Sequence, residues 1–139
     1  PTLTEELSNL TKTFQPFTVT MDKINFGFPG QNIASLLFYD LSDSTELRDM
    51  VTEMHSLVKE LDLEDTNRKK DHSKLINHLT IARTKRATSR SFTREINQYI
   101  ETLAFVPMTF EVKEVHLISS VFKENASVYS DLSTLPLGK

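Results

Sequence analysis

The sequence INHLTIARTK, residues 76–85, places a histidine and a threonine two positions apart. Alternate residues of a β-strand share a face, so His78 and Thr80 should project together, roughly 7 Å apart along the backbone. An imidazole transfers protons near neutral pH, and a neighbouring hydroxyl can donate a hydrogen bond to a phosphate oxygen. We expect Arg83, whose guanidinium suits a phosphate, to follow on the same face if the strand persists. The three residues indicate half of a phosphoryl-transfer site; the alternative is a chance H-x-T pattern with a surface histidine.

Positive charge surrounds this stretch although the chain as a whole is acidic. The net charge is −3, yet nine basic residues and a single acidic one, Asp71, lie between Arg68 and Arg94. A local basic patch on an acidic protein favours a local anionic ligand over a general coat for nucleic acid. Arg83 and Lys85 are therefore candidate substrate-binding residues. The alternative is that these side chains are simply solvated.

The other three histidines show no spacing that indicates a metal site. His55 lies on an expected helix, His72 lies in a polar stretch, and His116 shares no strand face with the nearby Ser119. The sequence contains no nucleophile elbow, phosphate-cradling glycine loop or metal-binding helix motif. We therefore expect neither a metal nor another cofactor.

Composition places the chain among folded proteins without a membrane span. Its 139 residues suffice for one domain with a core, and 38% hydrophobic and 25% charged residues are typical of a globular protein. No apolar stretch is long enough for a membrane helix, and the first ten residues do not resemble a secretory signal. Cysteine is absent, which excludes disulfides and thiolate chemistry and is typical of an intracellular protein. We expect a cytoplasmic protein.

Hydrophobic periodicity predicts an α+β chain of antiparallel strands and helices. Helices are expected over 4–14, 45–61 and 92–103, and strands over 17–26, 33–41, 75–83, 108–122 and 128–137. In the strand that carries His78, Leu79 and Ile81 are expected to point the other way, into a core. A change of alternation between Val112 and Val115 predicts a β-bulge near residues 113–114. Residues 62–74 are expected to form a polar loop.

The chain resembles the two-histidine phosphoesterases, the group of the bacterial and archaeal 2′-5′ RNA ligase-like proteins. NHLTIAR is similar to the second signature of that family: histidine, apolar, threonine, apolar, small, arginine. Downstream, Leu117, Ser120, the turn KENAS, Tyr129 and the closing Pro136-Leu137 follow the family's order. Upstream, the stretch from Phe17 to Leu41 resembles its strand, phenylalanine-proline turn and strand, and the helix near 45–61 falls where the family has one. The resemblance covers nearly the whole chain.

The resemblance implies a bilobal α+β fold in which two H-x-T/S strands, one in each lobe, face each other across a cleft. One histidine would act as general base and the other as general acid, while two hydroxyls hold the phosphate. His78 and Thr80 would be one catalytic pair, Arg83 a phosphate contact, and Tyr129 a residue of the cleft wall or a stacking surface for a base. Family substrates are 2′,3′-cyclic phosphates, 2′-5′ linkages and related RNA ends, usually without a metal.

The first H-x-T signature of the family is not present in these 139 residues. In the family it precedes the first helix, on an opening strand, whereas this sequence starts at Pro1 about where that strand would end. We considered three accounts: a fragment of an ordinary enzyme, a half-site relative with a true N-terminus at Pro1, and a homodimer or strand-donating partner that supplies the missing strand. The first is slightly favoured.

These observations lead to three hypotheses and a single expected domain over residues 1–139. The main hypothesis is an RNA-related phosphodiesterase of the two-histidine class that acts on 2′,3′-cyclic phosphates or 2′-5′ linkages by metal-independent acid–base catalysis. The alternative is a non-catalytic module that binds nucleotides or RNA ends through one half-site. A third and simpler hypothesis is a structural domain that only inherited the fold.

Overall fold

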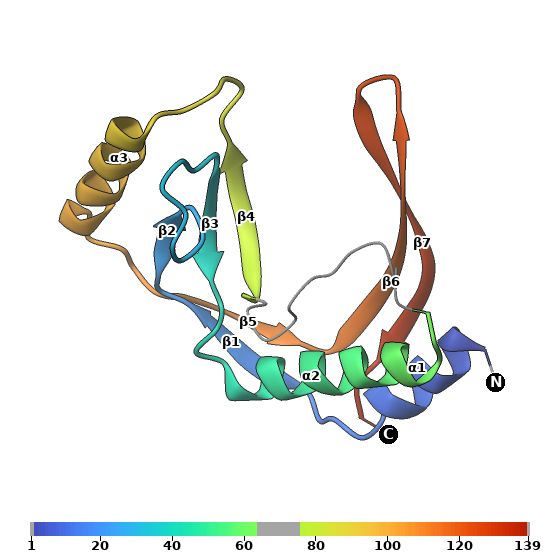
Figure 1. Ribbon diagram of the computed structural model, residues 1–139. Coiled ribbons are helices and arrows are strands. Elements are labelled where there is room, and N and C mark those ends of the chain that lie inside the picture. The colour runs from blue at the N-terminus through green and yellow to red at the C-terminus, as the bar shows by residue number, and fades with distance from the viewer. Residues whose placement is uncertain (1, 64–75, 139) are drawn as a thin grey trace. The chain divides into compact units, whose positions relative to one another are not determined.

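The computed structural model describes residues 2–63 and 76–138 (Figure 1). These residues form α1 (Leu3–Thr11), β1 (Phe17–Met21), β2 (Ile24–Phe26), β3 (Leu36–Asp40), α2 (Thr45–Glu60), β4 (His78–Arg83), α3 (Arg90–Thr102), β5 (Met108–Val112), β6 (Glu114–Lys123) and β7 (Ala126–Pro136). The predicted α+β class is confirmed, but the single strands expected over 17–26 and 108–122 are each divided in two, into β1 and β2 and into β5 and β6. Most of the expected polar loop, including His72, lies outside the described residues. No helix in the described ranges is both long and apolar enough to cross a membrane.

Hydroxyl side chains define where the helices begin. Thr2 and Glu5 form a reciprocal capping box at the start of α1, and the Ser89 hydroxyl accepts a hydrogen bond from the Phe92 N–H at the start of α3. In α2, the Leu47 N–H donates to the Ser44 hydroxyl. Each contact satisfies an N–H group that has no partner within its helix, so the local sequence fixes these boundaries.

The described chain divides into two compact units, and each is described by itself. One unit holds α1, most of α2, β6 and β7; its buried apolar residues are Leu7, Phe17, Met50, Leu135 and Leu137. The other holds β2, β3, β4 and α3; its buried apolar residues are Val19, Phe26, Ala34, Leu36, Phe38 and Leu41. Strands β1 and β5 pair with each other, and each contributes residues to both units.

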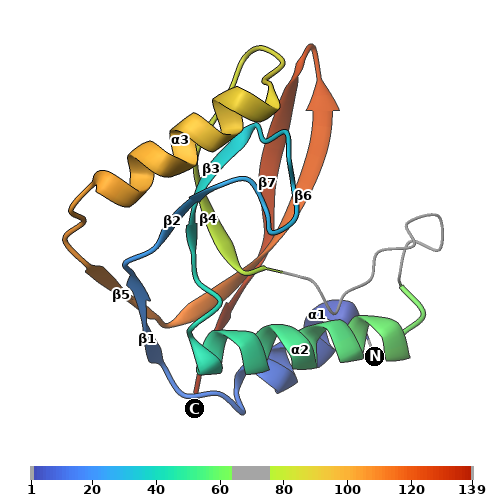
Figure 2. The ribbon, with the colours of Figure 1, turned by 60° about the vertical axis from the view of Figure 1, so that its left-hand side comes forward.

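In the unit that carries His78, strands β2, β3 and β4 form an antiparallel sheet in that order, with α3 packed against β2 (Figures 1 and 2). The Asn97 side chain fixes this packing, since it accepts from the N–H of Phe26 (3.2 Å) and donates to its carbonyl (2.9 Å). The Phe92 ring meets the Phe26 ring edge to face, at 5.9 Å between centroids. These contacts join α3 to β2 through residues that are 71 positions apart in the sequence.

The prediction that Leu79 and Ile81 point into a core is wrong. Their side chains are 48% and 46% exposed. In the described sheet β4 is an edge strand, and α3 packs against β2 at the opposite edge. Alternating apolar residues indicate a strand, but the covering element decides which of them are buried.

In the other unit, β6 and β7 form a long hairpin against which α1 packs. Glu124 and Asn125 join the strands in a two-residue turn, and both have positive φ (48° and 86°). A two-residue turn with positive φ at both positions matches the twist of the strands. The predicted bulge near residues 113–114 is wrong in position. The chain instead breaks between β5 and β6 at Lys113, and the register shift lies at Leu117/Ile118, where Leu132 of β7 has no cross-strand partner.

Candidate functional site

The register of the sheet places His78 and Thr80 on one face of β4. His78 lies opposite Asp40 and Thr80 lies opposite Phe38. Asp40 and Phe38 are alternate residues of β3, so they share a face, and cross-strand partners point the same way. The structure therefore brings together the two side chains that the H-x-T spacing predicts.

A register shift in the sheet adds Arg83 to this face. Five positions separate Arg83 from His78, and in a regular strand that odd number would turn the two residues to opposite faces. The ladder passes from Thr80 opposite Phe38 to Ala82 opposite Leu37, which leaves Ile81 without a partner. Arg83 then lies opposite Leu36, on the face of Phe38 and Asp40. The one-residue bulge thus restores the alignment that a regular strand would lose.

The imidazole of His78 is held by one backbone hydrogen bond and two aromatic rings. Its Nδ1 lies 2.7 Å from the Ile76 carbonyl oxygen, which can only accept, so Nδ1 carries the proton. The neutral ring therefore has its lone pair on Nε2. Phe28 and Phe38 meet the ring edge to face, with centroids 5.2 and 5.3 Å away. Nε2 has no hydrogen-bond partner in the described part of the chain and is available to a ligand.

Phe28 is a site residue that the sequence analysis did not select. Its ring stacks on Phe38, at 4.9 Å between centroids, and contacts His78 from the first position of a turn over residues 28–31. Gly27 has φ +89°, and a Cβ there would lie 2.5 Å from the Cβ of Ala34, so only glycine fits. The sequence signal for Phe28 is an aromatic residue between two glycines, in GFPG. His78, which it contacts, lies about 50 residues away along the chain, so the contact could not be predicted.

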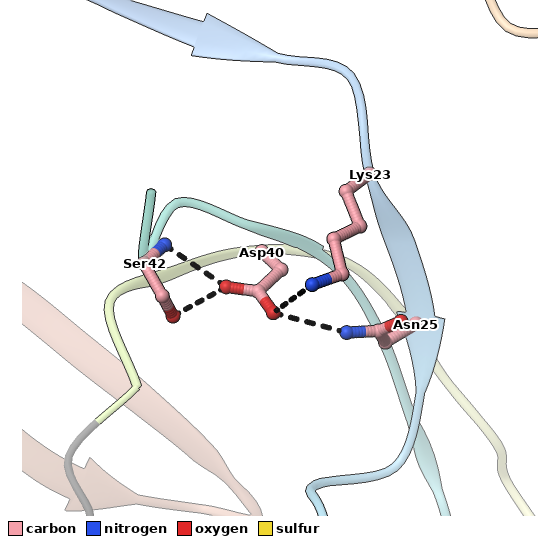
Figure 3. Close-up of polar contacts among 4 residues, drawn as sticks. All are labelled: Lys23, Asn25, Asp40 and Ser42. Carbon is pink, nitrogen blue, oxygen red and sulfur yellow. Dashed lines mark hydrogen bonds and ion pairs between the residues drawn. The ribbon is translucent and has the colours of Figure 1, made fainter. Parts of the chain in front are cut away.

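Asp40, opposite His78, makes several polar contacts (Figure 3). Its carboxylate accepts from the N–H (2.9 Å) and the hydroxyl of Ser42, accepts from Asn25 Nδ2 (3.1 Å), and lies 3.6 Å from Lys23 Nζ. Burial alone would raise the pKa of Asp40. The Ser42 hydrogen bonds and the Lys23 charge outweigh burial and hold the pKa below its ordinary value of 3.8.

We expect Asp40→Asn to lower the free energy of unfolding by about 1.5–3 kcal/mol at neutral pH, because the variant loses charge-assisted hydrogen bonds. The folded pKa is depressed, so this stabilisation is present above pH 3.8 and is lost as the pH falls through the folded pKa. Urea unfolding of both proteins between about pH 7 and about pH 3 measures the difference. A difference that stays constant over this range would contradict the assignment.

The remaining predicted site residues lie in different settings. Thr80, Arg83 and Lys85 are exposed, and none of their side chains has a hydrogen bond or ion pair with another described residue. Lys85 lies beyond the end of β4, in the connection to α3. Tyr129 belongs to the other unit, on β7 opposite Ser120, and is 67% exposed.

His116 differs from His78 because both of its ring nitrogens have protein partners. Nε2 lies 3.0 Å from a Glu114 carboxylate oxygen, and Nδ1 lies 3.5 Å from Asp131 and 3.4 Å from the Thr134 hydroxyl. Thr134 is the cross-strand partner of His116, so this histidine–hydroxyl pair joins two strands. No local sequence motif marks it, because the two residues are far apart along the chain. Within residues 2–63 and 76–138, no three His, Asp or Glu side chains are grouped so that they could hold a metal ion.

Comparison with solved structures finds chains of the same fold. The crystal structure of TT0787 from Thermus thermophilus matches with a TM-score of 0.68 and 21% identity over 99% of this chain and 70% of that chain. A crystal structure described as a phosphoesterase matches with a TM-score of 0.60 and 16% identity, over 99% and 70%. Escherichia coli LigT in complex with 3′-AMP matches with a TM-score of 0.58 and 17% identity, also over 99% and 70%.

No family model matches the sequence, and no curated protein matches it. At these identities the agreement concerns the fold, and it extends over nearly every residue of this chain. The chain therefore shares its α+β fold with these structures, one of which is described as a phosphoesterase and one as LigT.

Proposed function

We propose that the protein is a phosphodiesterase of the two-histidine class that acts on RNA-derived 2′,3′-cyclic phosphates or 2′-5′ linkages by acid–base catalysis. The observation that carries the proposal is the state of His78 in this fold. Its Nδ1 is committed to the Ile76 carbonyl, its ring is held by Phe28 and Phe38, and its Nε2 is open beside Thr80. A general base or acid needs such a fixed ring with one free nitrogen.

In the proposed reaction, Nε2 of His78 either takes the proton of the attacking oxygen or, when protonated, gives a proton to the leaving oxygen. The Thr80 hydroxyl donates a hydrogen bond to a phosphate oxygen, and the Arg83 guanidinium, on the same face, offsets the negative charge. The reaction needs a second acid–base group, and the 139 residues contain one H-x-T sequence. We propose that this group comes from residues outside this sequence, in a longer chain, in a second copy of such a longer chain, or in a strand-donating partner.

The descriptions of the similar structures support phosphate chemistry at such a site. One is called a phosphoesterase, and LigT has been crystallised with 3′-AMP, with NADP+ and with phosphate. Each of these ligands carries a phosphate group. A nucleotide with a 3′-phosphate is also one of the two products that opening of a 2′,3′-cyclic phosphate can give.

The test is hydrolysis of 2′,3′-cyclic AMP, a 2′-5′-linked diadenylate and a 3′-5′-linked diadenylate, followed by chromatography of the products. It is run on the 139-residue chain and on the product of the complete open reading frame. We expect turnover of one of the first two substrates and none of the third. Missing a second acid–base group should lower the rate by a factor of about 10²–10⁴. The absence of turnover of the first two substrates by both proteins would overturn the proposal.

A non-catalytic module for nucleotides or RNA ends is the second candidate, because the 139 residues carry one half-site. Thr80 and Arg83 would then bind a phosphate. Calorimetric titration with 3′-AMP separates the two candidates. Binding of 3′-AMP by both the wild-type protein and His78→Ala, together with no turnover of any phosphodiester by the wild-type protein, would favour the module; turnover by the wild-type protein that His78→Ala loses would favour the enzyme.

A further inference from the structure

A pocket of about 600 Å³ opens beyond the end of β4, between the strand and the start of α3. It is lined by residues 84–89 and Phe92, all within the unit that carries His78. Along an extended chain, Thr84 lies roughly 13 Å from Thr80. The pocket is therefore too far along the strand to hold the phosphate that reacts at His78, and Arg83 lies between the two places.

The charge around this pocket is positive and is not neutralised by the described residues. Five basic residues and no acidic ones lie between Arg83 and Arg94. Lys85 and Arg86 line the pocket, and neither forms an ion pair in the part of the chain that the structure describes. Unpaired cations that line a concave surface attract an anion, and a guanidinium suits a phosphate in particular.

Two further features indicate that the ligand carries more than a phosphate. Phe92 and Phe26 meet edge to face, yet 40% of Phe92 is exposed and the residue lines the pocket, where a planar base could stack. Thr84, in the pocket wall, has a buried hydroxyl oxygen without a hydrogen-bond partner among the described residues. Rotation about its Cα–Cβ bond would exchange hydroxyl and methyl group and offer the hydroxyl to a ligand.

The N-terminus of α3 is already capped, because the Ser89 hydroxyl accepts from the Phe92 N–H. The anion would instead be held by the side chains of Lys85 and Arg86. We infer that this pocket binds the phosphate and base of a second nucleotide, so that the substrate is a short single-stranded RNA and not only a mononucleotide. For the end of the RNA that reacts at His78, the inference rests on the proposed function; for the second nucleotide, it rests on the pocket.

Binding is measured first, without catalysis. A fluorescently labelled RNA hexamer with a 3′-phosphate is titrated with the protein at several KCl concentrations, by anisotropy. We expect Lys85→Gln and Arg86→Gln each to weaken binding about three- to tenfold, and to reduce the slope of log K against log salt by about 0.7. Lys59→Gln, which removes one positive charge from the last turn of α2, is the matched control and should leave both quantities unchanged.

Turnover then separates this inference from the proposed function. Arg86→Gln should lower kcat/KM for a hexamer with a 2′,3′-cyclic phosphate about three- to tenfold and leave kcat/KM for 2′,3′-cyclic AMP unchanged. An equal effect on both substrates, or none on either, would overturn the pocket while leaving His78-dependent hydrolysis intact. Hexamer binding that depends on Arg86, without any turnover, would support the pocket as a nucleotide site and overturn the proposed enzymatic function. Competition by inorganic triphosphate but not by the unlabelled hexamer would also overturn the inference.

Discussion

His78→Ala is expected to lower kcat for the proposed hydrolysis by a factor of about 10²–10⁴, because the variant has no group that can move a proton at this position. The loss should fall on kcat more than on KM, since Thr80 and Arg83 would still contact the phosphate. The folded state should change little, because His78 is exposed and is not one of the buried residues of the core. Initial rates with 2′,3′-cyclic AMP and thermal melting of the same samples measure both quantities.

Two control variants make this result specific. His78→Asn keeps an N–H group near the place of Nδ1, and therefore the hydrogen bond to the Ile76 carbonyl, but cannot transfer a proton. It should be as inactive as His78→Ala. His116→Ala removes a histidine whose two nitrogens have protein partners, and it should keep activity within about twofold. Wild-type rates in both His78 variants would show that the open Nε2 has no catalytic role.

The part of this site that depends on local periodicity could be predicted from the sequence. His78 and Thr80 share a face because the period of a strand is two, and the sheet register confirms it. Arg83 also lies on that face, but for a reason that the sequence does not contain. The bulge at Ile81 arises from how β4 pairs with β3, and pairing between segments roughly 40 residues apart is a tertiary property.

What could not be predicted depends on contacts between distant segments. Phe28 reaches His78 because Gly27 and Gly30 turn the chain back over β3, and no periodic pattern encodes that path. His116 meets Thr134 across a hairpin whose register shift was expected elsewhere. Leu79 and Ile81 have the spacing of core residues but lie on a strand that α3 does not cover. In each case the sequence predicts the strand or the turn itself, but it does not predict which segment packs against it.

Phe38→Ala is expected to lower the free energy of unfolding by about 3–5 kcal/mol, the range for removing a buried aromatic side chain. Phe38 is 0% exposed, stacks on Phe28 and forms one wall of the His78 site. Folded proteins are stable by only about 5–15 kcal/mol, so this change alone brings the protein close to unfolding. Urea unfolding, followed by far-UV circular dichroism, measures the loss. Phe38→Leu keeps most of the volume and should lose less than about 1.5 kcal/mol.

Phe28→Ala separates the two roles of this aromatic cluster. Phe28 is only half-buried, so its removal should cost about 1 kcal/mol of stability, well below the loss for Phe38. Both rings touch His78, however, and a ring that loses one of its two walls no longer holds Nε2 in a single direction. We therefore expect kcat to fall about tenfold in Phe28→Ala, measured where the variant remains folded. A wild-type kcat in this variant would mean that Phe28 only covers the core. The hydrogen bond to the Ile76 carbonyl would then be enough to orient His78.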